Sequence, residues 1–292
     1  MKSIAGIAAA FLAALASISA AQGADAIKLV AAENFYGSIA HQIGGVAVEV
    51  VSVMNNPDQD PHLFETSPAV ARQLAAAQIV IYNGADYDPW MAKLLSATPR
   101  PERTVIVAAD LVHRSAGDNP HLWYDPATMP AVATALSAAL IKADPAHQAD
   151  YTARLATFLA SLKPLNDKIG ALRKKYAGVP VTASEPVFGY MAAALGLQMR
   201  NEKFQLSIMN DTEPSARDVA AFERDLKERK VRMMFYNKQA SNKIVQHLVA
   251  IAGASKIPVV GITETIPPGM TYQEWMLNEL SDTEKALAGP SS

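Results

Sequence analysis

The sequence contains no cysteine. A chain without thiols can form no disulfide and can hold no metal through thiolates. It also offers no cysteine for a lipid at a mature N-terminus, so we expect no lipid anchor. Because disulfides are optional in exported proteins, the absence of cysteine neither supports nor opposes export.

An excess of positive charge is also missing. Lys and Arg number 26 against 28 Asp and Glu, which gives a formal net charge of −2, and the positive residues form no block. Proteins that bind nucleic acid or anionic membranes need a concentration of positive charge, so this composition argues against both partners.

Long apolar runs are confined to the start of the chain. Residues 1–23 begin with a Lys, continue with an apolar stretch that is too short to span a membrane, and end in small residues. This order is typical of a secretory signal peptide. No later run is long enough to cross a bilayer, so we expect an exported, soluble mature chain.

The common catalytic motifs are absent as well. The sequence has no G-x-x-x-x-G-K-[ST], no G-x-G-x-x-G, no H-E-x-x-H, no G-x-S-x-G and no EF-hand loop. These absences argue against the corresponding phosphate-binding, dinucleotide-binding, metalloprotease, hydrolase and calcium-binding classes.

What the sequence does contain is an alternation of short apolar runs with helical patterns, which predicts α/β lobes with mostly parallel sheets flanked by helices. The predicted strands are 27–31, 48–54, 79–84, 104–110, 180–184, 231–237 and 257–263. The predicted helices between them include 68–77, 127–142, about 188–195 and one that begins near Ser215.

One long helical stripe separates two groups of strands. Apolar residues recur at steps of three and four across 145–178, and this pattern predicts a connecting helix between an N-terminal lobe, 24–144, and a C-terminal lobe, 179–292. Pro164 lies inside the stripe and predicts a kink or a break. A coiled-coil dimer seam is the competing interpretation. We favour a connector, because strand–helix alternation resumes directly after it.

Chemically active side chains follow the predicted strands, where ligands bind in open parallel sheets. His62 follows the second strand, His113 and His121 follow the fourth, and Glu185 and Glu264 follow strands of the C-terminal lobe. Two imidazoles and two carboxylates form a donor set that suits a divalent cation, whose charge offsets that of the carboxylates.

Each of these residues also has an ordinary structural interpretation. A histidine is more often a surface or core residue than a ligand, and we assign that role to His41, His147 and His247 in helical stretches. His113 is ambiguous because its flanking residues resemble an exposed loop. A glutamate after a strand often caps the next helix, so only the combination of the four residues supports a metal site.

The motifs around these residues resemble one known family. The chain is similar to the metal-binding solute-binding proteins of bacterial zinc and manganese ABC importers over nearly its whole mature length. The stretches that carry the resemblance are VAAENFYGSIAHQIGG, DPHLFETSP, IVIYNGADYDPWM, NPHLWYDP, SEPVFGYMAAALGL, EPSARDV and GITETIPPGMTYQEWM.

The resemblance implies two α/β lobes joined by a long rigid helix, with one divalent transition metal ion between them. It places the ligands on His62, His121, Glu185 and Glu264. Zinc-specific members usually have His at the third position and many members have Asp at the fourth. The acidic, His-rich loop of many zinc importers is reduced here to RSAGD. This ligand set is therefore closer to that of a manganese- or iron-binding member, with zinc as the next candidate.

The resemblance further implies a periplasmic carrier without enzymatic activity that delivers its ion to the permease of an ABC importer. It also implies a monomer, and it allows for a periplasmic metallochaperone as a further partner. Three other functions stay open from the sequence: a secreted metal-dependent hydrolase, a two-lobed receptor for an organic metal chelate such as haem or a siderophore, and an adhesin that carries a metal.

Overall fold

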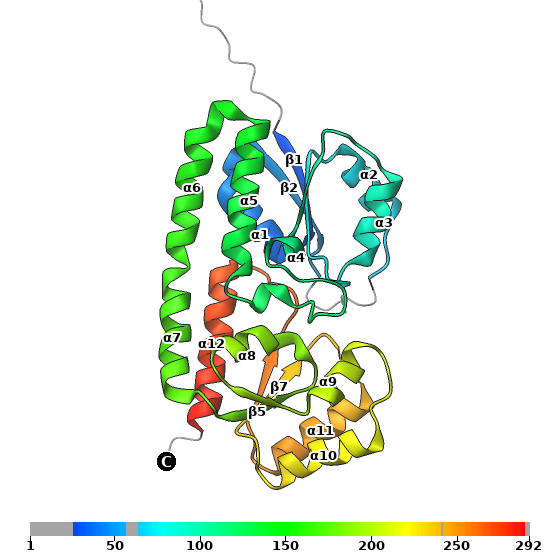
Figure 1. Ribbon diagram of the computed structural model, residues 1–292, viewed down its shortest axis with the longest axis vertical. Helices are drawn as coiled ribbons and strands as arrows, with labels where there is room; N and C mark the ends of the chain where they lie inside the picture. The colour runs from blue at the N-terminus through cyan, green and yellow to red at the C-terminus, as the bar shows by residue number, and fades with distance from the viewer. Residues whose placement is uncertain (1–25, 57–63, 241, 290–292) are drawn as a thin grey trace, which may run out of the picture.

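The protein has two α/β lobes, one above the other, with a pair of helices along one side (Figure 1). The computed structural model describes residues 26–56, 64–240 and 242–289. The predicted signal peptide and His62 lie outside the described residues. Each lobe contains a four-stranded parallel sheet, so the predicted fold class is confirmed.

The N-terminal lobe is built around the strand order β2-β1-β3-β4. Its strands are β1 (Ile27–Glu33), β2 (Val48–Met54), β3 (Ile79–Tyr82) and β4 (Thr104–Val107). Its helices are α1 (Asn34–Gly44), α2 (Pro68–Ala76), α3 (Pro89–Ala97), α4 (Ala108–Leu111) and α5 (Thr128–Ala143), with the 3-10 turns η1 (Gly45–Ala47) and η3 (Leu122–Tyr124). The predicted strand 104–110 is shorter than expected, because its last residues form α4.

Helices cover both faces of this sheet, as the apolar strands require. Along β1, Leu29 and Ala31 belong to the core beneath α1 and α5, whereas Val30 and Ala32 belong to the core beneath α2 and α3. Successive side chains of a strand point to opposite faces, so a continuously apolar strand is stable only where both faces are covered.

The C-terminal lobe repeats the same topology with the order β6-β5-β7-β8. Its strands are β5 (Pro180–Ala183), β6 (Gln198–Arg200), β7 (Met234–Asn237) and β8 (Val259–Ile262). Its helices are α8 (Gly189–Ala194), α9 (Glu202–Met209), α10 (Ala216–Lys227), α11 (Lys243–Ala254) and α12 (Tyr272–Ala288), with the 3-10 turn η5 (Pro186–Phe188). The helix predicted to begin near Ser215 is α10, and Ser215 caps it, because its side chain accepts a hydrogen bond from the backbone N–H of Asp218.

The predicted connecting helix is two consecutive helices, α6 (Gln148–Ser161) and α7 (Lys163–Tyr176), after the 3-10 turn η4 (Pro145–His147). The break falls at Leu162, two residues before Pro164, which lies in the first turn of α7 and has no N–H to donate. Most side chains of the apolar stripe, including Tyr151 and Leu172, are buried within this chain. Because they are buried here, they do not form the surface that the competing interpretation, a coiled-coil dimer seam, requires. Lys168 of α7 pairs with Glu284 of α12 at 2.9 Å.

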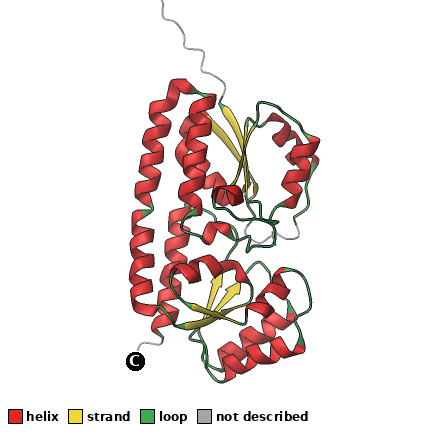
Figure 2. Ribbon diagram, in the orientation of Figure 1, coloured by secondary structure: helices red, strands yellow, loops and turns green. Residues whose placement is uncertain are grey.

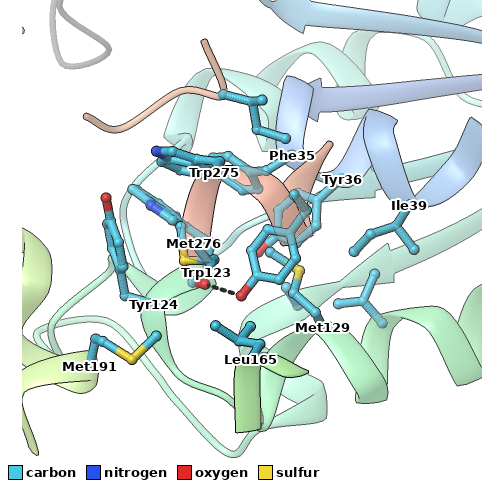
Figure 3. Packing of buried hydrophobic residues seen from close by; sticks show 14 of the residues in the cluster. Phe35, Tyr36, Ile39, Trp123, Tyr124, Met129, Leu165, Met191, Trp275 and Met276 are labelled. Carbon is cyan, nitrogen blue, oxygen red and sulfur yellow. Dashed lines mark hydrogen bonds between the residues drawn. The ribbon is translucent and has the colours of Figure 1, made fainter. Parts of the chain in front are cut away.

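One hydrophobic cluster extends through both lobes. Phe35 of α1 stacks on Trp123 with ring centroids 4.5 Å apart, and Tyr124 lies 5.6 Å from Trp275 of α12. Tyr124 also contacts Phe188 of the C-terminal lobe, with centroids 5.1 Å apart. Figure 3 shows the rings of Phe35, Trp123, Tyr124 and Trp275 close to one another. The lobes are therefore packed against each other through aromatic side chains.

In the ranges that the structure describes, no helix combines the length and the apolar character that a membrane span requires.

Candidate metal centre

The candidate residues lie where the two sheets approach each other. The strand arrows of the C-terminal sheet point toward the N-terminal lobe (Figure 2). The segments that follow β4, β5 and β8 carry His121, Glu185 and Glu264, and all three side chains are buried. In both sheets the candidate residues therefore lie beyond the carboxyl ends of parallel strands, the position where ligands bind in open α/β folds.

The imidazole of His121 meets the carboxylate of Glu264 across the lobe boundary. Nε2 of His121 lies 3.4 Å from Oε2 of Glu264, and both side chains are fully buried. The hydroxyl of Tyr87, from the loop after β3, donates to the same Oε2 at 3.0 Å. Charged oxygens are buried only where donors or cations compensate them, and the Tyr87 hydroxyl is one such donor.

Asn119 sets the orientation of the His121 ring. Its Oδ1 lies 2.6 Å from Nδ1 of His121, while its Nδ2 donates to the backbone oxygen of Pro186 at 2.7 Å. Because Oδ1 is an acceptor, the hydrogen of the neutral ring is on Nδ1, and the lone pair of Nε2 points toward Glu264. A partner on the other ring nitrogen that fixes the tautomer is typical of metal-ligating histidines.

Close packing supports this arrangement. A Cβ atom at Gly189, the first residue of α8, would lie 2.8 Å from Nδ2 of Asn119. The hydroxyl of Tyr190 donates to the backbone oxygen of Asn119 at 2.8 Å. The loop that carries His121 is therefore held against the C-terminal lobe by two hydrogen bonds.

Glu185 and Glu264 are joined through the amide of Asn237. Nδ2 of Asn237 donates to Oε2 of Glu185 at 2.5 Å and to Oε1 of Glu264 at 2.7 Å. Its Oδ1 accepts from the backbone N–H of Gln239, which is consistent with this orientation of the amide. Asn237 ends β7, and β7 lies between β5 and β8, so the sheet order itself places the amide between the two glutamates.

Glu185 does not serve the ordinary structural role considered for it. It stands at the N-cap position of η5, but its side chain makes no capping hydrogen bond.

The backbone of Glu264 is held by the side chain of Gln239. The backbone N–H of Glu264 donates to Oε1 of Gln239 at 2.5 Å, and Nε2 of Gln239 donates to the hydroxyl of Thr265 at 3.1 Å. Gln239 thus fixes the backbone on which Glu264 stands.

The structure brings together only part of the predicted ligand set. His121 and Glu264 are in contact, and Glu185 is linked to Glu264 through Asn237. His62 lies outside the described residues, and within them no group of three or more His, Asp or Glu is arranged to hold a metal ion. The amide of Asn237 occupies one oxygen of each glutamate. The four-ligand set stays a prediction.

The remaining histidines lie at the surface, which agrees with the role assigned to three of them. His41 is exposed in α1. His147 pairs with Asp144, and His247 lies 3.1 Å from Glu223. His113 is exposed, in a turn where its φ is 55°.

A buried acid pair near the site was not predicted from the sequence. Glu33 ends β1, and Asp88 accepts hydrogen bonds from the backbone N–H groups of Asn83 and Gly84 at 2.6 and 2.8 Å. Burial, and next the charge of Asp88, raises the pKa of Glu33 well above its usual range. Burial also raises the pKa of Asp88 to about 6, against the effect of those N–H groups. Burial therefore disfavours the charged form of both carboxyl groups.

The fold and these contacts define a class of protein. Two parallel α/β lobes present buried imidazole and carboxylate groups to each other at the carboxyl ends of their strands, as a two-lobed binding protein with an interlobe site does.

Comparison with known proteins identifies the family. The family model for the periplasmic component A of the zinc-uptake complex, ZnuA, matches residues 29–286, so the chain belongs to that family. This confirms the resemblance inferred from the sequence motifs.

The relatives are distant in sequence. A putative metal-binding protein of Treponema pallidum is 24% identical over 288 residues, which cover 90% of this chain and 88% of the relative. The manganese ABC transporter substrate-binding lipoprotein PsaA of Streptococcus pneumoniae is 22% identical over 284 residues, 89% of this chain and 88% of PsaA. The zinc-binding protein AdcA of Streptococcus pyogenes is 24% identical over 73% of this chain, and the match spans 47% of AdcA, about half its length.

Solved structures share the fold. The crystal structure of ZnuA superposes with a TM-score of 0.73 at 24% identity and covers 91% of this chain and 100% of the other. The periplasmic zinc-binding protein TroA from Treponema pallidum superposes with a TM-score of 0.74 at 19% identity, over 89% of this chain and 98% of TroA.

Proposed function

We propose that this protein is a periplasmic carrier that binds one divalent transition metal ion between its lobes and delivers it to the permease of an ABC importer. The contact between Nε2 of His121 and Oε2 of Glu264 carries the proposal. These atoms come from opposite lobes, and two acceptor atoms at 3.4 Å favour a cation beside both. The ligand set is completed by Glu185 and His62.

The cargo is Zn²⁺ or Mn²⁺, with Fe²⁺ as a third candidate. A set of two imidazoles and two carboxylates gives Zn²⁺ its four-coordinate sphere and gives Mn²⁺ additional oxygens if the carboxylates bind bidentately. The intrinsic order of affinity places Zn²⁺ above Mn²⁺ at such a site. Zinc-binding and manganese-transporter relatives support both ions.

A carrier is favoured over the other functions. A catalytic zinc keeps one position open for water, whereas four protein ligands would fill a tetrahedral sphere. A haem or siderophore needs a wide cleft, whereas the exposed fractions of His121, Glu185 and Glu264 are only 0%, 3% and 0%.

We further propose that the protein is exported with removal of residues 1–23 and that the mature chain is a monomer without a lipid anchor. We place its lobes near 24–144 and 179–292.

Titration of the metal-depleted mature chain with Zn²⁺ and with Mn²⁺ tests the proposal. We expect one ion per chain. Each of His62→Ala, His121→Ala, Glu185→Ala and Glu264→Ala should weaken binding, whereas His113→Ala, which removes an exposed imidazole from the same lobe, should not. Tight binding that survives all four ligand substitutions, or turnover of a phosphoester by the metal-loaded chain, would overturn the assignment.

A further inference from the structure

The carboxyl group of Glu279 is buried at the contact between the lobes and has no role in the proposed ligand set. Glu279 lies on α12 and is 8% exposed. Its Oε1 accepts hydrogen bonds from the indole N–H of Trp275 at 2.9 Å and from the backbone N–H of Thr263 at 3.2 Å. Its Oε2 lies 2.6 Å from the hydroxyl oxygen of Tyr124. This single side chain therefore contacts segments of both lobes.

The contacts of the Tyr124 hydroxyl indicate the protonation state of the Glu279 carboxyl group. The hydroxyl oxygen lies 2.6 Å from Oε2 of Glu279 and 2.7 Å from the backbone oxygen of Thr263. One hydroxyl hydrogen cannot serve two acceptors at full strength. Both short contacts are satisfied when Glu279 is a carboxylic acid that donates to Tyr124, while Tyr124 donates to Thr263.

The environment of Glu279 favours the acid form. Burial raises the pKa of Glu279 to about 7, although hydrogen bonds from Tyr124, Trp275 and Thr263 and the charge of Lys238 oppose the increase. Two titratable groups act on the pKa of Glu279, Tyr124 on η3 and Lys238 after β7, and the charge of Glu279 in turn contributes to raising the pKa of Tyr272 on α12. Charged groups between α7 and α12 pair with one another instead: Lys168 and Lys175 with Glu284.

Tyr124 and Thr263, which both contact Glu279, lie close to the candidate ligands in the chain. Thr263 directly precedes Glu264, and Tyr124 follows His121 by three residues, in the turn that begins there. When Glu279 loses its proton, the Tyr124 hydroxyl donates to the carboxylate, because hydrogen bonds to charged acceptors are stronger. The backbone oxygen of Thr263 then loses its donor from the N-terminal lobe.

We propose that protonated Glu279 is a positioning residue that ties the loops of His121 and Glu264 together through Tyr124, and that its ionisation lowers the affinity for the metal ion. This inference rests on the proposed function for its effect on metal. The chain of hydrogen bonds from Glu279 through Tyr124 to Thr263, which we call the proton chain, does not depend on that function.

The variant Glu279→Gln separates the proton from the side-chain shape. The amide nitrogen of glutamine donates to Tyr124 at every pH, as the acid does, and its oxygen accepts from Trp275 and Thr263. We expect this variant and the parent to bind Mn²⁺ equally at pH 6. By pH 8.5 the parent should bind about threefold to tenfold more weakly than the variant, the equivalent of one hydrogen bond.

Two control variants test whether the Tyr124 hydroxyl carries the effect. Tyr124→Phe in both backgrounds should abolish the difference between Glu and Gln at position 279. Glu284→Gln, which removes the charge of a partly exposed carboxylate on the same helix, should leave the pH dependence of the parent unchanged. A ratio of affinities that stays constant from pH 6 to 8.5 would overturn the proposal, since a merely structural role of Glu279 gives no pH-dependent ratio.

The metal-free proteins provide a measurement that does not depend on the proposed function. The native state keeps the Glu279 proton where the unfolded state has lost it, so the parent should lose stability relative to Glu279→Gln as pH rises from about 4.5 to about 7. Urea unfolding at several pH values measures this difference. If it is absent, the proton chain is refuted. If it is present but no chain binds metal, the proposed function fails and the effect on affinity fails with it.

Discussion

Replacement of Asn237 by alanine tests whether the glutamates act as a pair. Asn237 is 1% exposed, and its Nδ2 donates to one oxygen of Glu185 and one of Glu264. Two carboxylates that share one nitrogen lie within about 5 Å, where the repulsion is about 3 kcal/mol at an effective dielectric constant of about 20. Without the amide, this repulsion pushes the carboxylates apart and disturbs the geometry that an ion needs.

We expect Asn237→Ala to bind metal about 10- to 100-fold more weakly, the usual cost of losing a group that orients metal ligands. Competition with a chromophoric chelator measures the affinity. Gln205→Ala is the matched control, because it removes a buried amide from the same lobe whose Nε2 donates to the backbone oxygen of Arg200 at 2.7 Å. If the two variants bind metal equally well, Asn237 does not orient the pair.

Two further predictions concern stability. Free metal at 100 times its dissociation constant adds about 2.7 kcal/mol, which should raise the melting temperature by about 5–10 °C in thermal unfolding, and His121→Ala should show no such rise. Arg200→Ala should cost about 1–2 kcal/mol without changing metal affinity, because it removes the charged partner of buried Asp225. Burial pushes the pKa of Asp225 up, but hydrogen bonds from Arg200 and Asn201 bring it below 3.8, so this stabilisation is present above about pH 4 and is lost in acid. Acid titration of both proteins by urea unfolding should therefore show their stabilities converging, and a constant difference down to pH 2 would contradict the assignment.

The sheets could be predicted from the sequence because their signal is local. Continuous apolar runs such as 27–31 and 48–54 are stable only as strands covered on both faces, and both runs are strands of the N-terminal sheet. The short strand β6, whose residues are only partly buried, carries no comparable run and was missed. Its pairing with β5 depends on the lobe as a whole.

The candidate site could be predicted only in part. His121, Glu185 and Glu264 follow strands, so the strand-end rule finds them. Asn237 also ends a strand, and applying the rule to amides would have included it. Glu279 could not be found in this way, because it lies within a helix and meets Tyr124, which is 155 residues away in the sequence. Contacts of that range depend on the tertiary fold.

The aromatic cluster shared by the lobes has a consequence for how cargo could enter and leave. A large opening between the lobes would expose Trp123, Tyr124 and Trp275 to water, and all three are at most 1% exposed in the structure. Each large aromatic ring brought into water costs a few kcal/mol. Exchange of the ion should therefore proceed by local rearrangement at the rim of the site, with the body of the molecule staying closed.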